Sequence, residues 1–323
     1  MALDITRSQP PAIGMEHHGN HPPDGGEWFQ ESALFNFSDP RSGIGGQYRI
    51  GIHPVHQSAH LYTWTQINGK MVDKRFIEGL KLPEGDVNDC ALSDVTFATL
   101  EPYKKYRIQV VQPEFELDVI WEAFTIPIQM GFNVGGATVA AGHYNCIGRA
   151  TGKAMYKGVE FSINGDGFMD HSWGARKTHV PGSRWILAIV DPECFFMALP
   201  LLTDVGRFMA GYVAFDGKLR MLTNDFDINM TMRDDWFTPA ACDARFFDED
   251  GRGFRLSGRS LGPSSSQPFL GGKAYTHALA EFEFGGRIGR GLLESSAPEN
   301  LLPSMNKAYQ LDPAGIWCAR QGL

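Results

Sequence analysis

A short run near the middle of the chain, "NGDGFMDHSWGAR" (residues 164–176), gathers the side chains of general acid–base chemistry within a few positions. Asp170 and His171 can each donate or accept a proton, and Arg176 can stabilise an anion or hold a carboxylate in place. Trp173 adds an aromatic face that can stabilise a developing positive charge. We therefore take Asp170 and His171 as candidate catalytic residues, and Trp173 and Arg176 as candidates for binding the substrate.

The same run is expected to form a strand, because apolar and polar residues alternate along it. Successive side chains of a strand point to opposite faces, so His171 and Trp173 share one face while Asp170 lies on the other. The two adjacent residues then cannot pair as an acid–base dyad unless the bend at Gly174 reorients them. One of them should line a cavity while the other braces the fold. A purely structural domain corner, with Asp170 accepting backbone N–H groups, is the alternative.

A second group of candidates lies early in the chain, in "DGGEWFQESALFNFSDP" (24–40). Glu27 and Glu31 flank the aromatic residues Trp28 and Phe29. An apolar wall raises the pKa of a nearby carboxyl group until it can donate a proton at neutral pH. We expect Glu27 to act as an acid or base, and Trp28, Phe29 and Glu31 to contact the substrate. The alternative is a first strand whose glutamates pair with arginines or cap a turn.

Histidines are concentrated in two runs, "MEHHGNH" (15–21) and "IHPVHQSAH" (52–60). The first is flanked by glycine and proline, where only adventitious metal binding is expected, since functional metal sites take ligands from rigid elements. In the second, Pro54 and the surrounding alternation favour a strand or a bulge. Neither run has an HExxH or Cys/His spacing. We expect no metal and no other cofactor, and metal-assisted hydrolysis by these histidines is kept as a further hypothesis.

The elements that must position these residues have the pattern of strands. The stretch "QYRIGIHPVHQSAHLYTWTQINGKMVDKRF" (47–76) alternates apolar and polar residues up to Asn68-Gly69, and this dipeptide is a strong hairpin signal. Asp216-Gly217 and Asp250-Gly251 mark further turns between alternating runs. No helix of more than about three turns is evident. The pattern predicts an antiparallel all-β protein.

The length of 323 residues exceeds the size at which a single core usually keeps growing, so two domains are expected. The proline-containing segment 1–25 is predicted to be an extended N-terminal arm. A glycine-rich run before a new strand places a domain boundary near residue 155, with β domains over 26–155 and 156–323. Two successive meanders of this size suit two related barrels or sandwiches.

Composition narrows the range of partners and compartments. The net charge of −8 is accompanied by no cluster of basic residues of the kind that binds nucleic acid. The N-terminus has neither the basic start nor the apolar run of a secretory signal, and no stretch approaches a membrane helix of about 18 apolar residues. We expect a soluble, cytoplasmic protein without membrane insertion. Its five scattered cysteines, which form no CxxC pair, should be reduced and mostly buried.

The two groups of candidates together resemble a known family. Lipocalin-like, two-domain proteins that include the carotenoid 1,2-hydratases, AttH-type proteins and kievitone hydratase carry an E-W-W-Y-type element early in the first barrel. In "EWFQESALF" (27–35), Glu27, Trp28 and Phe29 match this element, whereas Gln30 stands where an aromatic residue is usual. Position 30 therefore carries no tyrosine hydroxyl.

The second element of the resemblance is of the D-H-x-W-G type, which the family carries near the start of its second barrel. Asp170, His171, Trp173 and Gly174 match it. The resemblance implies two antiparallel calycin-like β-barrels or half-barrels packed side by side. It also implies cofactor-independent acid–base chemistry on a hydrophobic small molecule held in an aromatic-lined cavity.

On this basis we expect a lyase of the hydratase or dehydratase type that acts on a terpenoid or phenylpropanoid-like aromatic compound. A related elimination with release of a small aldehyde would need similar acid–base groups. Two alternatives stay open: a non-enzymatic carrier of a hydrophobic ligand, in which the barrel merely encloses its guest, and a cofactor-free isomerase or cyclase. Open barrels have edge strands that can pair between chains, which also leaves a homodimer open.

Overall fold

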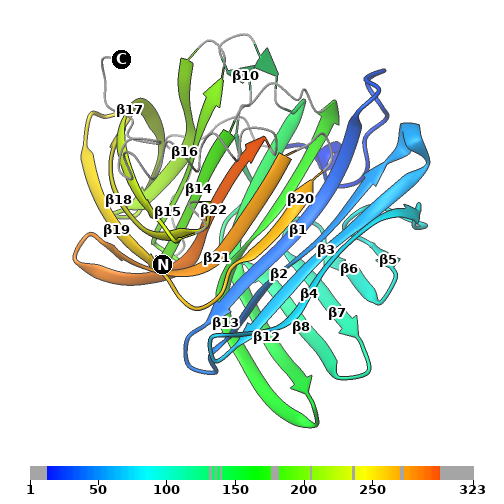
Figure 1. The fold of residues 1–323 in the computed structure, drawn as a ribbon. Helices are drawn as coiled ribbons and strands as arrows, with labels where there is room; N and C mark the ends of the chain where they lie inside the picture. Colours follow the sequence, from blue (N-terminus) through cyan, green and yellow to red (C-terminus); the bar gives the residue numbers. More distant parts are fainter. Residues whose placement is uncertain are drawn as a thin grey trace. The chain divides into compact units, whose positions relative to one another are not determined.

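The computed structural model describes residues 13–130, 133–134, 137–138, 140–175, 182–203, 206–234, 237–269 and 273–298. The chain divides into two compact units after Lys177. Each unit is built on an antiparallel β-sheet that curls into a barrel (Figure 1). Within the described ranges the only helices are two short 3₁₀ turns, η2 (Met15–His17) and η3 (Pro54–His56). This confirms the predicted all-β class with two calycin-like barrels.

The N-terminal barrel is formed by strands β1 (Phe29–Asp39), β2 (Ile44–His53), β3 (Ser58–Ile67), β4 (Lys70–Lys81), β5 (Cys90–Leu92), β6 (Val95–Glu101), β7 (Lys105–Val111), β8 (Phe115–Ala123), β9 (Ile128–Gln129), β12 (Gly142–Tyr156) and β13 (Val159–Ala175). Their order is β4-β3-β2-β1-β13-β12-β8-β7-β6-β5, with β9 beside β12, and β10 (Asn133–Val134) pairs with β11 (Ala137–Thr138). The barrel is nearly closed: Arg75 of β4 reaches across the seam from Asp73 to Asp94.

The interior of this barrel is lined by alternate residues of its strands. Phe35 of β1 lies at the centre, with its ring centroid 4.9 Å from that of Phe97 and 5.0 Å from that of Tyr106. Inward-facing residues of β1 and β13, including Ala33 and Met169, belong to the same core. In Figure 1, β1 runs between β2 and β13 although β13 lies far along the chain. Non-local pairing therefore brings the two sequence elements together.

The C-terminal barrel is formed by β14 (Gly182–Asp191), β15 (Cys194–Thr203), β16 (Gly206–Phe215), β17 (Lys218–Met232), β18 (Pro239–Asp248), β19 (Gly253–Ser260), β20 (Ser265–Phe269), β21 (Lys273–Phe284) and β22 (Arg287–Pro298). Eight of these strands form a closed ring, because β19 at one end of the sheet also pairs with β21. Its interior is packed with aromatic and aliphatic residues such as Phe196, Phe246 and Phe284.

The predicted hairpins are present at the predicted dipeptides. Asn68 and Gly69 connect β3 to β4 with φ values of 49° and 72°, and Asp216 and Gly217 connect β16 to β17 with 53° and 70°. Positive φ at both central residues is the signature of the tight turn that suits the twist of a hairpin. Gly251, with φ of 77°, lies in the turn between β18 and β19. Local turn chemistry was sufficient for these predictions.

The domain boundary lies elsewhere than predicted. Residue 155 falls at the end of β12, which pairs with β13 over its whole length, from Gly142 opposite Trp173 to Tyr156 opposite Val159. The compact units divide after Lys177 instead. The strand expected to open the second domain is therefore the last strand of the first. A glycine-rich hairpin inside a sheet and a linker between domains have the same local sequence signature, and only the pairing of β13 with β1 separates them.

The N-terminal segment, defined here as residues 13–21, packs on the N-terminal barrel, although an extended arm was expected. His18 is buried and hydrogen bonds the hydroxyl of Tyr106 at 3.2 Å. The Tyr103 hydroxyl donates a hydrogen bond to the carbonyl of Gly14 at 2.5 Å. The segment contacts the β6–β7 turn on one side and, as shown below, the ends of β1 and β13 on the other. It thus crosses one end of the barrel.

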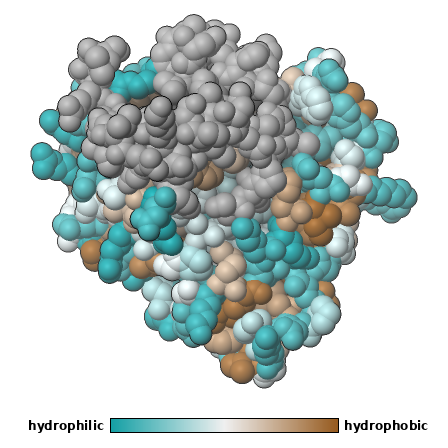
Figure 2. Space-filling model, viewed as in Figure 1, coloured by the Kyte–Doolittle hydropathy of each residue, from teal (hydrophilic) through white to brown (hydrophobic). Residues whose placement is uncertain are grey.

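The surface of the described residues mixes polar and apolar side chains. On the face viewed in Figure 2, hydrophilic residues alternate with small separate hydrophobic patches, as on most protein surfaces. The cysteines at positions 90, 146, 194 and 242 are buried and free, as expected. No helix among the described residues is long and apolar enough to span a membrane.

Candidate active site

Strand β13 directs Asp170 and His171 to opposite faces, as the alternation predicts. Asp170 lies on the outer face, where it pairs with His143 and accepts a hydrogen bond from Nδ2 of Asn145 at 3.1 Å. His171 points into the barrel and pairs with Glu31 of β1. The two adjacent residues thus belong to two separate histidine–carboxylate pairs.

The inner pair is the centre of a hydrogen-bonded chain of three side chains. Oε1 of Glu31 lies 2.5 Å from Nε2 of His171, and Nδ1 of the same imidazole lies 3.1 Å from the hydroxyl of Tyr144. The side chains of Glu31 and His171 are fully buried, with 0% exposed. Carboxylate, imidazole and phenol therefore follow one another inside the barrel.

Sheet register explains how this chain is assembled. His171 lies directly opposite Tyr144 of β12 and opposite Ala33 of β1. Directly opposed residues have Cβ atoms about 4.5–5.5 Å apart, and diagonal neighbours on the same face remain within reach of long side chains. Glu31, two positions from Ala33, is such a diagonal neighbour. A shift of register by one residue would turn each of these side chains to the other face.

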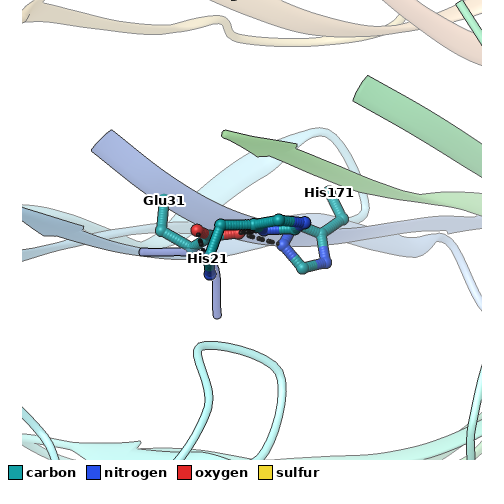
Figure 3. Close-up of side chains that lie close together, drawn as sticks. All are labelled: His21, Glu31 and His171. Carbon is teal, nitrogen blue, oxygen red and sulfur yellow. Dashed lines mark hydrogen bonds and ion pairs between the residues drawn. The ribbon is translucent and has the colours of Figure 1, made fainter. Parts of the chain in front are cut away.

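The N-terminal segment adds His21 to the same site (Figure 3). The backbone N–H of His21 donates to Oε2 of Glu31 at 3.0 Å, and its ring Nδ1 lies 3.0 Å from Oε1. The other ring nitrogen of His21 lies 2.9 Å from Nδ1 of His17. Glu31 consequently has hydrogen-bond partners on both sides, one from β13 and the other from the segment that crosses the barrel end.

Trp173 forms the floor on which these histidines stack. The ring centroids of His21 and Trp173 are 4.0 Å apart with an interplanar angle of 7°, and His17 stacks at 5.1 Å. The indole lies over Gly142 of the neighbouring strand, where a Cβ would come within 2.1 Å of the ring. Gly174, at φ of +118°, then bends the chain in a conformation that favours glycine. Gly142 therefore makes room for the indole, and Gly174 bends β13 just before its last residue, Ala175.

Electrostatics assign a proton position to each member of the chain. Burial raises the pKa of Glu31, but the hydrogen bonds from His171 and His21 outweigh burial, so the net pKa lies below the ordinary glutamate value. Burial places the pKa of Tyr144 well above its ordinary value. Glu31 is then a carboxylate that accepts N–H from Nε2 of His171, and Nδ1 of His171 accepts the Tyr144 hydroxyl. This tautomer follows from the hydrogen-bond network.

The arrangement can move protons. In many enzymes a hydroxyl group is activated by an imidazole that accepts its hydrogen bond, and a carboxylate orients that imidazole. His171 can take the Tyr144 proton and return it, while Glu31 stabilises the imidazolium formed in between. Two aromatic rings lie beside Tyr144: the ring centroid of Tyr103 is 5.4 Å and that of Trp173 is 6.4 Å from the ring centroid of Tyr144. The surroundings suit an apolar reactant.

A metal ion is the other chemistry to test at this place. Among the described residues, His21, Glu31 and His171 bring three donor atoms within 4.8 Å of one another, and zinc and iron take such donor sets. However, Oε1 of Glu31 lies 2.5 Å from Nε2 of His171 and 3.0 Å from Nδ1 of His21. Ligands of a tetrahedral zinc stand about 3.3 Å apart. In this structure the three side chains are spaced as hydrogen-bond partners.

The other residues predicted for the site lie in different places. Glu27 is exposed in the turn before β1, and Trp28 is 46% exposed with its ring 4.8 Å from His56. Phe29 is buried in the barrel core. Arg176 lies outside the described residues. Of the early group, only Glu31 reaches the pair centred on His171.

The sequence did not reveal Tyr144, and it placed the histidines of the N-terminal segment in an extended arm. Gln30, which stands where the family resemblance has an aromatic residue, lies on the opposite face of β1 from Glu31. The hydroxyl in the site comes from Tyr144 on β12 instead. The only sequence signal for it was the alternation of "GHYNC" (142–146) after a glycine-rich stretch, and this does not reveal which strand lies alongside.

Comparison with known proteins supports the fold. A family model described as "Domain of unknown function (DUF7064)" matches residues 14–299. By sequence, the chain matches none of the curated proteins. Among solved structures, an AttH-like protein from Nitrosomonas europaea is 16% identical, with a TM-score of 0.66 over 89% of this chain and 98% of the other.

Two further structures have the same fold. Kievitone hydratase from Nectria haematococca is 11% identical, with a TM-score of 0.61 over 92% of this chain and 97% of the hydratase. CghA, solved with Sch210972, is 10% identical, with a TM-score of 0.57 over 90% and 96% of the two chains. The two-barrel fold implied by the sequence resemblance is therefore confirmed.

Proposed function

This chain belongs to the DUF7064 family and has the two-barrel fold of AttH-like proteins and kievitone hydratase, and from that premise we propose that it is a hydratase-type lyase acting on a hydrophobic small molecule. The observation that carries the proposal is the buried chain Glu31–His171–Tyr144. Fold likeness at this level of identity supports the architecture, whereas the reaction type is inferred from the site.

In the dehydration direction, Tyr144 passes its proton to Nδ1 of His171 while its oxygen removes a proton from a substrate carbon. The imidazolium formed at His171 is stabilised by the Glu31 carboxylate. Tyr144 then gives the abstracted proton to the departing hydroxyl group and regains its own from His171. One alkene and one water molecule result, and the protein returns to its starting state. Hydration follows the same steps in reverse, and such acid–base groups contribute about 10²–10⁴-fold to a rate.

The proposed chemistry needs no cofactor, because each proton is moved by a side chain. Aromatic residues around Tyr144 favour an apolar reactant, and we propose terpenoid and phenylpropanoid-like aromatic compounds as the first substrate classes to screen. Elimination with release of a small aldehyde uses the same base and is the second reaction to assay. Asp170, bonded to His143 on the outer face, is proposed to brace β13 against β12 and thereby to hold His171 in register.

A hydrophobic-ligand carrier is the second candidate function. It is favoured by one observation: Glu31 and His171 are fully buried and hydrogen bonded to each other, which is also how a structural pair in a barrel wall is stabilised. A carrier would bind its ligand without changing it. Substitution of the hydroxyl-bearing residue separates the two functions.

The test begins with mass spectrometry of apolar compounds that co-purify with the protein, followed by assays with those compounds and the screened classes. Tyr144→Phe should reduce turnover by about 10²–10⁴-fold while ligand binding and the melting temperature stay close to wild type. Tyr48→Phe is the matched control, since Tyr48 is buried in the same barrel and its hydroxyl bonds Thr65 at 2.6 Å, away from the site. Full turnover by Tyr144→Phe would reject the enzyme proposal at this site.

A further inference from the structure

The N-terminal segment (residues 13–21) belongs to the site without belonging to the barrel wall. Apart from the short turn η2, it contains no strand or helix among its described residues. Hydrogen bonds that involve side chains hold it at both ends. Near its start, Gly14 bonds Tyr103 and His18 bonds Tyr106. Near its end, the side chain of Asn20 accepts a hydrogen bond from the backbone N–H of Val87 at 2.9 Å. Elements held in this way open more easily than strands bonded on both sides.

The segment lies between the catalytic pair and solvent. Glu31 and His171 have 0% of their side chains exposed, whereas His21, which bonds Glu31, is 11% exposed. His17, which bonds His21, is 35% exposed. Exposure therefore rises stepwise along the hydrogen-bonded histidines. A reactant must contact the buried groups, so an element that covers them has to move. Among the described residues that cover them, the N-terminal segment is the part that does not belong to a barrel strand.

The segment also supplies hydrogen bonds that Glu31 depends on. Of the bonds to this carboxylate, those from the backbone N–H and ring Nδ1 of His21 come from the segment, and that from His171 comes from the barrel. A buried carboxylate is strongly disfavoured unless its oxygens are paired. If the segment lifts, Oε2 of Glu31 loses its backbone donor and Oε1 loses one of its two partners. Opening thus weakens the charged form of Glu31.

We propose that the N-terminal segment is a lid that completes the active site when it docks, with His21 as a positioning residue that aims the Glu31 carboxylate at His171. This inference rests on the proposed function of the Glu31–His171–Tyr144 chain. Opening admits the reactant, and closing restores the hydrogen bonds that keep Glu31 charged. Substrate entry and activation of the base are then coupled through one side chain.

The sign of the pH dependence follows from this geometry. Glu31 is faced by His171 of β13, His21 of the lid and Tyr144 of β12. Tyr103, Tyr106 and Cys146 lie around Tyr144. In the lid, His17 bonds His21, and His18 interacts with His171, Asp86 and Asp89. Hydrogen bonds from the lid lower the pKa of Glu31. Docking is therefore favoured while Glu31 is charged, and this contribution is lost as the pH falls through the pKa of the docked state. Acid should open the lid.

The direct experiment follows the ¹³Cδ resonance of Glu31 by NMR as a function of pH in the full-length chain, with Glu31→Gln used to assign it. In His21→Gln, the side-chain amide is one bond farther from the backbone than Nδ1 of the imidazole and cannot replace it. The midpoint of the Glu31 titration should therefore move to higher pH. In His21→Asn, whose amide nitrogen occupies the position of Nδ1, the midpoint should return toward wild type. The matched control is His56→Asn, an exposed histidine outside the site, and its midpoint should equal that of wild type.

Hydrogen exchange measures docking independently. Amide protection in residues 13–21 should fall by roughly ten- to a hundredfold in His21→Gln and in Glu31→Gln, the range expected for loss of one hydrogen bond to a charged group. Protection of β1 and β13 should be unchanged in His21→Gln, which leaves the Glu31–His171 pair intact. Equal Glu31 midpoints in wild type and His21→Gln, or unchanged protection of residues 13–21, would overturn the lid inference.

The two proposals can fail separately. If Tyr144→Phe keeps full turnover while the Glu31 midpoint still responds to His21, the proposed reaction is wrong and the coupling of segment to carboxylate stands. If Tyr144→Phe is inactive while His21→Gln changes neither the midpoint nor the low-pH limb of kcat/KM, the reaction stands and the lid is rejected. Stoichiometric binding of zinc by chelator-washed protein, lost in His21→Gln, would also reject it in favour of a metal site.

Discussion

The two barrels each contain a buried histidine–glutamate pair, yet the pairs are placed differently. In the N-terminal barrel, Glu31 and His171 lie on the same faces of their strands as the core residues Ala33 and Met169, and they point inward. In the C-terminal barrel, His277 and Glu294 lie 2.6 Å apart, directly opposite one another on β21 and β22. There the core is formed by the alternate residues Phe282 and Leu293, so the pair is on the outer face of its barrel.

Because one pair points inward and the other lies on the outer face, a buried ion pair is not in itself a sign of catalysis. Both pairs satisfy the need of buried polar groups for partners. The inner pair differs because its imidazole contacts a hydroxyl, Tyr144, and its carboxylate contacts a segment outside the sheet through His21. The closed C-terminal barrel has an aromatic core, and its histidine–glutamate pair lies outside that core. The nearly closed N-terminal barrel has the hydrogen-bonded chain Glu31–His171–Tyr144 in its interior.

The largest expected effect separates the two pairs. His171→Gln should lower turnover by about 10²–10⁴-fold, because it removes the group that accepts the Tyr144 proton. His277→Gln should lower thermal stability while turnover per folded molecule stays within severalfold of wild type. Steady-state kinetics on folded protein, with melting curves for both variants, provide the comparison. Equal loss of turnover in both variants would remove the distinction between an active and a structural pair.

Core truncations test whether the two units have separate cores. Phe35→Ala in the first core and Phe196→Ala in the second should each reduce the free energy of unfolding of its own barrel by about 3–5 kcal/mol. Both side chains are almost completely buried among other aromatic rings. Hydrogen exchange read separately on residues 29–175 and 182–298 measures the effect. If either substitution loosens both ranges equally, the barrels unfold as one unit.

The seam between β4 and β5 is a weakness that the closed barrel does not share. Arg75→Met should destabilise the N-terminal barrel by about 1–3 kcal/mol, since Asp73, with 4% of its side chain exposed, loses a charged partner. Arg107→Met is the control, because the pair of Arg107 with Asp118 is solvent-exposed and such pairs contribute little. Chemical denaturation measures both, and equal effects would show that the seam is not held by Arg75.

The smallest effect should be the same in both barrels. Gly69→Ala and Gly217→Ala introduce a Cβ at φ values of 72° and 70°, with no atom within 4 Å of the added group. The cost is purely conformational and should be about 1 kcal/mol in each barrel. Thermal melts of the paired variants check it. A much larger effect at one turn would mean that the hairpin there has a role beyond its own strands.

Much of the architecture was predictable because its causes are local. The Asn68-Gly69 and Asp216-Gly217 turns were read from dipeptides whose conformational preferences do not depend on the rest of the chain. The opposite orientation of Asp170 and His171 followed from the two-residue period of a strand. The boundary near residue 155 was displaced because a hairpin and a linker have the same local composition.

What the sequence by itself determined is the set of strands, the turns between them and the face on which each side chain lies, since these depend on neighbours a few residues away. Only the tertiary structure decided which face is inside and which residues meet there. Glu31 and His171 are 140 residues apart, Tyr144 comes from a third strand, and His21 from a segment with no strand pattern. Their meeting depends on the register of non-local pairs, which no short stretch of sequence encodes.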